Sequence, residues 1–265
     1  MTALSNTNMP FVDFSSENRI GFITLNRPDK RNALSFELID ELKKTFKAAE
    51  ADPSVKVIVL RAKGDVFCAG ADLAYLQKLQ TFSFEENLAD SKHLRDLLLT
   101  IYTLKKVVIA QVHGHAIAGG CGLASVCDLI VAVPEAKFGY TEVRLGFVPA
   151  LVMTFLIRRI GETRAKELLL TGELISAESA ASIGLINRVV KADELEAHVK
   201  ILAKQLVDSS STQSLERTKR LIGQLPTMPL EQALEHAARE NAESRQTDDF
   251  KKGIGSFLDK TKLTW

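Results

Sequence analysis

A glycine-rich segment near the middle of the chain is the stretch best suited to chemistry. Three glycines lie within residues 119–122. They follow an apolar run at 107–112, typical of a buried strand, and precede an apolar segment at 123–127 that we expect to be helical. Glycine lets a ligand approach the backbone because no Cβ intervenes, and a helix start presents free N–H groups and a positive dipole. The segment therefore predicts a site for negative charge.

The same glycines also have a purely structural interpretation, which is tight packing of the strand against the helix. Their spacing matches neither the dinucleotide-binding motif nor a phosphate-binding loop that ends in Lys-Ser or Lys-Thr. A second small-residue turn, at 67–73, follows a predicted strand at 55–60 and opens into a predicted helix. A strand, a small-residue turn and a helix thus occur twice, which indicates a weak internal repeat of β-β-α type.

Composition and charge argue against several classes of function. The chain has 265 residues, 46% hydrophobic and 25% charged, as in an ordinary globular protein. A net charge of +1 without a basic run argues against nucleic acid and anionic membranes as partners. The three cysteines, Cys68, Cys121 and Cys127, have no metal-type spacing with the five histidines, so we expect no metal site and reduced thiols. With no signal-peptide pattern and no apolar run of the ~20 residues that a membrane helix needs, we expect a cytoplasmic protein without membrane contacts.

Hydrophobic periodicity places the elements that must hold the two turns. Beyond an expected frayed tail at 1–10, strands are predicted at 19–26, 55–60, 107–112, 128–133 and, in short form, 186–190. Helices are predicted between Ser35 and Asp52 and at about 81–104, 151–160, 163–171, 176–182, 192–208, 211–223, 230–245 and 247–259. Ser35 and Asp72 are candidate N-caps, and Gly161 is a candidate helix-ending glycine. The first 150 residues thus alternate strand and helix, and the remainder is helical.

Several motifs, taken in order, resemble one known family. They are Leu25-Asn26-Arg27-Pro28 with Asn32-Ala33-Leu34, Phe67-Cys68-Ala69-Gly70-Ala71-Asp72-Leu73, Gly119-Gly120-Cys121-Gly122-Leu123-Ala124 and Phe138-Gly139-Tyr140-Thr141-Glu142. Together they resemble the crotonase family (enoyl-CoA hydratase/isomerase) over nearly the whole chain after residue 10. The resemblance implies an α/β fold, in which a crotonase-like spiral of β-β-α units at 11–195 forms two sheets and holds an acyl-CoA site. An all-helical trimerisation region at 196–265 would follow, and the protein would be a homotrimer or a dimer of trimers.

The resemblance also implies a set of catalytic groups. Family members bind an acyl-CoA thioester as substrate, need no cofactor, and stabilise an enolate oxyanion with two backbone N–H groups. By motif position these are the N–H groups of Ala71 and Gly119. Glu142 matches a family acid/base glutamate, whereas Gly122 stands where the best-known hydratases carry a second one. If the rest of a two-glutamate site is intact, Gly122→Glu is predicted to raise hydration of crotonyl-CoA.

Contacts to CoA follow from the same motifs. The implied CoA-binding residues are Lys30, Arg31, Ala33, Ala69, Asp72, Leu73, Gly120, Phe257 and Lys260. Phe257 and Lys260 would approach the CoA phosphates from a neighbouring helix or subunit. There Lys260 would supply a point charge to a phosphate, or it would be an ordinary solvated lysine at a helix end. The roles of three further residues stay open. His115 could carry a proton or bind backbone, Arg144 could bind a substrate carboxylate or pair with a neighbouring acid, and Tyr140 could line the acyl pocket or pack between subunits.

Three functions remain in play. The first is an acyl-CoA hydratase that acts on a 2-enoyl-CoA thioester through an oxyanion-stabilised enolate with a single glutamate. The second is a Δ3,Δ2-enoyl-CoA isomerase, which a lone Glu142 favours. The third is a non-catalytic CoA-binding or RNA-associated scaffold. Residues 139–150 most resemble the methylglutaconyl-CoA hydratase-like branch of the family, and this favours hydration.

Overall fold

The computed structural model describes residues 11–265, so the tail expected at 1–10 lies outside the described residues. Its main sheet has six strands in the order β1-β2-β3-β4-β6-β9. Their bounds are β1 Val12–Glu17, β2 Ile20–Leu25, β3 Val57–Ala62, β4 Val107–Val112, β6 Leu129–Ala132 and β9 Arg188–Val189. β1 pairs with β2 antiparallel, and every other neighbouring pair is parallel. The sequence analysis predicted all of these strands except β1.

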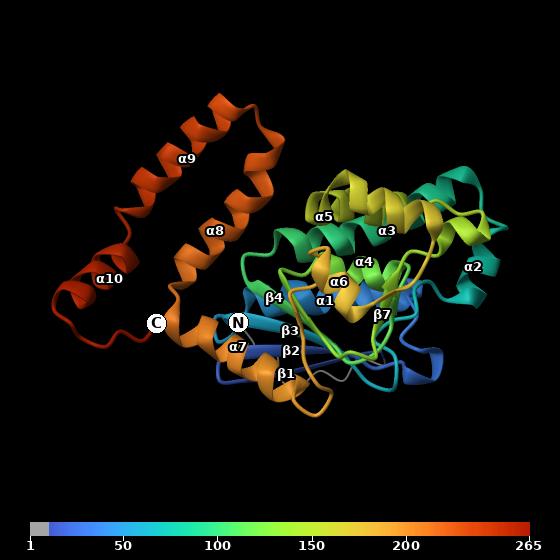
Figure 1. Cartoon of the computed structure of the whole chain (residues 1–265), viewed down its shortest axis with the longest axis horizontal. Helices are drawn as coiled ribbons and strands as arrows, with labels where there is room; N and C mark the ends of the chain where they lie inside the picture. Colours follow the sequence, from blue (N-terminus) through green and yellow to red (C-terminus); the bar gives the residue numbers. More distant parts are fainter. Residues whose placement is uncertain (1–10) are drawn as a thin grey trace.

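Helices cover the sheet and close its core. Every residue of β2 is buried, which requires cover on both faces of the strand. Helices α1 (Phe36–Ala51) and α7 (Leu195–Ser209) both contact β2, and α3 (Phe84–Thr103) packs on α1. The predicted cap of α1 is confirmed, because the Ser35 side chain accepts a hydrogen bond from the Leu38 N–H. These layers form one apolar core from which the site turns emerge (Figure 1).

A second, smaller sheet lies beside the site. It contains β5 (Ala116–Ile117), β7 (Lys137–Gly139) and β8 (Ile175–Ser176), with β7 in the centre. β5 pairs with β7 parallel and β8 pairs with it antiparallel. Strands of two or three residues leave no periodic pattern, which explains why the sequence analysis did not predict them. The predicted α/β fold with two sheets is confirmed.

The remaining helices agree with the predicted order, with two differences. They are α2 (Leu73–Leu79), α4 (Gly119–Ser125), α5 (Ala150–Thr171), α6 (Ala177–Ser182), α8 (Thr212–Gln224), α9 (Leu230–Ser244) and α10 (Asp248–Leu258), with short 3-10 turns η1 (Pro28–Lys30), η2 (Glu142–Leu145) and η3 (Leu225–Thr227). First, the glycines lie inside α4, so the helix begins four residues before the predicted 123–127. Second, the helices predicted on either side of Gly161 are counted together as α5, but Gly161 itself has a non-helical φ of 76° and ψ of 165°, so two helices meet there at a kink and the predicted helix-ending glycine is confirmed.

The last three helices leave the body of the molecule. α7 packs on the sheet and α8 contacts α3 and β4, whereas α9 and α10 extend to one side; α8, α9 and α10 together are called the arm (Figure 1). Exposed leucine, isoleucine and phenylalanine side chains lie on this arm, namely Ile222, Leu230, Leu234, Phe250, Ile254, Phe257 and Leu258. The predicted division at 195/196 falls at the start of α7, and both the two-domain division and a trimerising role for the arm stay predictions.

Over residues 11–265, no helix is long and apolar enough to cross a membrane.

Candidate active site

Two backbone turns meet where the sequence placed its candidate oxyanion donors. The Cys68 N–H donates to the carbonyl of His115 at 3.1 Å, and the Ile117 N–H donates to the carbonyl of Cys68 at 3.0 Å. These bonds hold the turn before α2 against the turn before α4. Leu34 forms a bridge with Ala71, so the turn that follows β2 joins the same cluster. Three segments far apart in the sequence thus converge.

Gly70 makes the approach of the two donor segments possible. Its φ is +93°, and a Cβ at this position would lie 2.9 Å from the Ala118 Cβ and 3.6 Å from the Gly119 nitrogen. A side chain here would therefore be strained and would also push the two turns apart. Ala118 itself has φ 52° and ψ −124°, an uncommon conformation for alanine. The Ala118 N–H donates to the Gly139 carbonyl at 2.7 Å, which holds this conformation in place.

The N–H groups of Ala71 and Gly119 are both free to act as donors. Gly119 is the first residue of α4, so its N–H has no acceptor within the helix. Ala71 precedes Asp72, the N-cap of α2. Within residues 11–265, no hydrogen bond from either N–H is found among the backbone bonds of turns, loops and caps. This arrangement suits two donors that act on one oxygen atom, as predicted for an oxyanion hole.

Glu142 lies on the segment that joins the small sheet to α5. It follows β7, whose Gly139 carbonyl binds Ala118 next to the donor Gly119, so the small sheet ties Glu142 to the oxyanion turn. The Glu142 residue is only 8% exposed, and its Oε2 atom is buried without a hydrogen-bond partner in the described part of the chain. Burial raises the pKa of the Glu142 carboxyl above its ordinary value. A buried, unpaired carboxyl is a costly feature that an active site can use as an acid or base.

A match to a family model decides the affiliation of the chain. The model described as Enoyl-CoA hydratase/isomerase covers residues 15–265. The chain belongs to this family. It is therefore an enzyme of the enoyl-CoA hydratase/isomerase family, and the assignment made from the sequence motifs is confirmed.

Individual relatives agree with this affiliation over their full length. A Thermus thermophilus protein whose name refers to enoyl-CoA hydratase is 44% identical over 241 residues, which are 91% of this chain and 95% of that protein. The crotonyl-CoA hydratase of Syntrophomonas wolfei is 35% identical over 256 residues, which are 96% of this chain and 97% of that protein. The crystal structure of an enoyl-CoA hydratase from Mycobacterium smegmatis has a TM-score of 0.91 at 32% identity, covering 97% of this chain and 99% of that chain. The fold is that of the crotonase family.

Most of the residues predicted to bind CoA lie around the two turns. Lys30 and Arg31 are exposed in the turn after β2, and Ala33 is buried just beyond them. The Ala69 N–H donates to the Arg31 carbonyl at 3.1 Å, which joins this turn to the one before α2. Leu73 is 73% exposed at the start of α2. Two exposed cations thus lie in the turn that is bonded to the turn before α2.

Asp72 has a mainly structural environment. Its Oδ1 accepts hydrogen bonds from the N–H groups of Ala74 and Tyr75, which confirms the predicted helix cap. Its Oδ2 lies 2.7 Å from the Arg27 guanidinium. Both carboxylate oxygens are thus already used, so the Asp72 side chain caps α2 and pairs with Arg27 rather than presenting a free group. The sequence analysis did not single out Arg27, although it lies within the Leu25–Pro28 motif.

Two other predicted CoA contacts lie far from the turns. Phe257 is on α10 with 80% of its surface exposed, and Lys260 follows the same helix with φ 52°. The arm carries both away from α2 and α4 of the same chain (Figure 1). The structure therefore does not bring them together with the other candidate residues. Gly120 lies within α4, where a Cβ would be 2.2 Å from the Cys68 carbonyl oxygen, so its part here is close packing of the turns.

The residues left open by the sequence have defined surroundings. The Nδ1 atom of His115 accepts a hydrogen bond from the Lys137 N–H at 3.2 Å, which supports the loop interpretation. Tyr140 is fully buried beside Ser125, so it neither lines a pocket nor faces another subunit. Arg144 is exposed and lies against Gly172, and it forms no ion pair within residues 11–265. Of the two interpretations of Arg144, the ion pair with a neighbouring acid is therefore not found within the described residues. Cys68, Cys121 and Cys127 are free and buried, as predicted.

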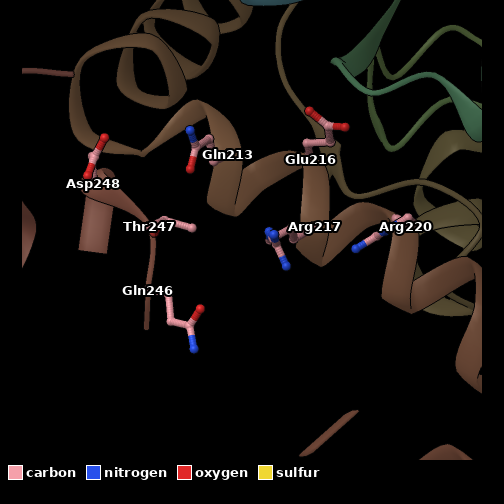
Figure 2. A pocket seen from close by; sticks show the side chains of 7 residues that line it. All are labelled: Gln213, Glu216, Arg217, Arg220, Gln246, Thr247 and Asp248. Atoms are coloured by element: carbon pink, nitrogen blue, oxygen red, sulfur yellow. The ribbon is translucent and has the colours of Figure 1, made fainter. Parts of the chain in front are cut away.

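Two surface hollows lie elsewhere in the molecule. One, of about 470 Å³, is on the arm between α8 and α10, and Figure 2 shows the Arg217 and Arg220 side chains at its edge. Both arginines pair with Glu240, so the hollow presents little free positive charge. The other, of about 690 Å³, crosses the end of the main sheet at Arg61. Neither hollow contains a candidate catalytic residue. Within residues 11–265, no three His, Cys, Asp or Glu side chains are grouped to hold a metal ion.

Proposed function

We propose that the protein is an acyl-CoA hydratase that adds water to a 2-enoyl-CoA thioester with Glu142 as its only acid/base carboxylate. The observation that carries this proposal is the buried, unpartnered Oε2 of Glu142 on a segment tied to the oxyanion turn. Hydration is supported by the names of several relatives, which refer to enoyl-CoA or crotonyl-CoA hydratases. A cofactor plays no part in the proposed reaction, since the CoA thioester is the substrate.

The proposed mechanism moves one proton through Glu142. The thioester carbonyl oxygen accepts hydrogen bonds from the Ala71 and Gly119 N–H groups. Ionised Glu142 takes a proton from water while the water oxygen bonds to C3, and the electrons of the double bond move through C2 to the carbonyl oxygen. The resulting enolate is stabilised by the two N–H groups. Glu142 then returns the proton to C2, so that the elements of one water molecule have been added.

The raised pKa of Glu142 suits this double role. A group that accepts and then donates the same proton works best when its pKa lies near the working pH. Burial shifts the Glu142 pKa in that direction from the ordinary value of a glutamate. General acid–base catalysis of this kind contributes roughly 10²–10⁴-fold to a rate. The exposed Lys30 and Arg31 are proposed to bind the phosphates of CoA at the mouth of the site.

One observation favours isomerisation as a second candidate. Position 122 is a glycine enclosed by α5, so the site holds no second carboxylate at the place where two-glutamate hydratases carry one. In an isomerase, Glu142 would remove a proton from C2 of a 3-enoyl thioester and return it at C4. The electrons would pass through a dienolate held by the same two N–H groups, and no water would be consumed.

Product identification separates these candidates. Crotonyl-CoA, 3-methylglutaconyl-CoA and 3-hexenoyl-CoA are incubated separately with the full chain, and the products are analysed by mass. A gain of one water by either of the first two, with 3-hexenoyl-CoA unchanged, is the expected result. An isomer of unchanged mass from 3-hexenoyl-CoA, without hydration elsewhere, would replace hydration by isomerisation. A third outcome is that calorimetry shows tight CoA binding while none of the three thioesters is converted. This outcome would refute both reactions and would support the non-catalytic CoA-binding scaffold.

A further inference from the structure

Gly122 lies against one side chain of the neighbouring helix. It is the fourth residue of α4, and α4 packs on α5. An ideal Cβ at position 122 would lie 2.2 Å from the Cγ1 of Val152 and 3.0 Å from its Cβ. Real Cβ contacts essentially never fall below 3.0 Å, so any side chain at 122 requires Val152 to move. Val152 is 4% exposed and has little room to do so.

The space that Val152 takes adjoins the candidate active site. Residues 119 and 122 are three apart in α4 and therefore share a helix face, with the 122 side chain directed toward the helix start. That start carries the Gly119 N–H. On the other side, η2 with Glu142 packs against α5, the helix that carries Val152. A Cβ at position 122 would thus fall among the Val152 methyl groups, on the face of α4 that also carries Gly119.

We propose that Val152 is a specificity-determining residue that keeps a second carboxylate out of the site and leaves Glu142 to move every proton. This inference rests on the proposed function, because it concerns the number of proton carriers in that same site. It also changes an expectation from the sequence. Gly122→Glu alone cannot restore a two-glutamate site, since the new side chain and Val152 compete for the same space.

The packing part of the proposal is tested without any measurement of activity. The thermal unfolding midpoint is measured for Gly122→Ala in the full chain and in a Val152→Gly background. Thr154→Gly is the matched control background, because Thr154 lies in the same turn of α5 but is exposed. We expect Gly122→Ala to lower the midpoint clearly in the wild-type and Thr154→Gly backgrounds and much less in the Val152→Gly background. An equal loss in all three backgrounds would overturn the proposed contact.

The catalytic part is tested with crotonyl-CoA. Hydration by Gly122→Glu/Val152→Gly is compared with that by Gly122→Glu/Thr154→Gly, after circular dichroism has shown both to be folded. We expect at least a tenfold higher kcat for the first variant, since one acid/base group contributes about 10²–10⁴-fold. Its pH profile should also show one more ionisation than the wild type, which a change in packing alone would not produce.

The outcomes distinguish the two proposals. If the wild type converts none of the three thioesters named above, the proposed function is wrong, and the proposed role of Val152 is refuted as well. If the wild type is active but the folded double variant shows neither a gain nor a new ionisation, only the role of Val152 is overturned. A gain from Gly122→Glu with Val152 in place would overturn it as well, because the two side chains would then fit together.

Discussion

At the scale of single residues, the environment of Glu142 explains why one carboxylate can be sufficient. Its Oε2 is buried without a partner, so the ionised form lacks the solvation that water would supply. Burial is also the largest cause of the raised pKa of Glu142, whereas a hydrogen bond with its own backbone lowers that pKa. The folded protein therefore holds this group closer to protonation than an exposed glutamate, at a cost to stability.

Replacing this carboxyl by an amide should remove catalysis and keep binding. For Glu142→Gln we expect a fall in kcat of about 10²–10⁴-fold, because the amide cannot accept and return a proton. Titration calorimetry with an acyl-CoA should show nearly unchanged affinity. Glu135→Gln, an exposed glutamate before β7, is the matched control and should keep full activity. An active Glu142→Gln variant would exclude Glu142 from the proton transfer.

The same substitution should raise stability at neutral pH. A carboxyl with a raised pKa binds more protons in the folded state than in the unfolded state, so its effect on stability becomes unfavourable as pH rises through the interval between the two pKa values. Glu142→Gln removes this effect. We expect its unfolding midpoint to exceed that of the wild type at pH 7 and the difference to shrink as the pH is lowered toward the ordinary glutamate pKa of 4.5. A difference that does not change with pH would contradict the assigned pKa shift.

At the scale of elements, buried polar contacts hold the donor turns in register. The Asn32 amide donates to the carbonyls of Lys63 and Val66, at 2.8 Å each. Arg27 pairs with Asp72, which caps α2 directly after the donor Ala71. These contacts join the turn after β2 to the turn before α2. Because each buried group is satisfied by the neighbouring turn, loss of one partner affects both.

Two substitutions at Asp72 separate the helix cap from the ion pair. Asp72→Asn keeps an oxygen for the N–H groups of Ala74 and Tyr75 but loses the charge that faces Arg27. Asp72→Ala loses both, and removal of an N-cap costs about 0.5–2 kcal/mol. We therefore expect chemical denaturation to show a larger loss for alanine than for asparagine. We also expect a lower kcat for Asp72→Ala than for Asp72→Asn, since the Ala71 N–H would no longer be held in place. Equal effects of the two variants would show that the charge of Asp72, and not its helix cap, is what matters.

At the scale of the whole molecule, the arm is attached to the body at its base. The Lys56 ammonium donates to the Val207 carbonyl at 2.7 Å, where α7 ends. The backbone N–H of Trp265 donates to the Asp208 carbonyl at 3.2 Å, and the Trp265 carbonyl accepts a hydrogen bond from the Arg19 guanidinium at 2.7 Å. Lys219 of α8 pairs with Asp128 at 2.8 Å. The arm thus has a defined direction while its apolar side chains stay exposed, which suits a homotrimer or a dimer of trimers.

Substitutions on the arm test this assembly. Light scattering of the wild type should give three or six chain masses. We expect Leu230→Glu/Leu234→Glu, on the exposed face of α9, to reduce the mass toward one chain, because charges at these positions oppose burial in an interface. Ile201→Glu, at an exposed position on α7, is the control and should leave the mass unchanged. A wild type that is monomeric at all concentrations would refute the predicted assembly.

Features that depend on near neighbours in the chain could be predicted from the sequence. The strand at 107–112, the helix between Ser35 and Asp52, and the caps at Ser35 and Asp72 were predicted because their hydrogen bonds and periodicity involve residues only a few positions apart. The ordered motifs led to the family and hence to the two-sheet fold. The sequence also showed that Gly122 stands where the best-known hydratases carry a glutamate. It did not show which neighbouring side chain occupies the space at that position.

The way in which distant residues share space follows from the folded chain and not from any local stretch of it. Val152 occupies the place of a side chain at position 122, thirty residues earlier in the chain. The burial of Glu142, the Arg27–Asp72 pair and the two-residue strands β5 and β8 likewise depend on partners from other segments. Packing is a property of the volume that several segments enclose together, so no local pattern in the sequence records it. For this protein, that volume decides how many proton carriers the proposed site can hold.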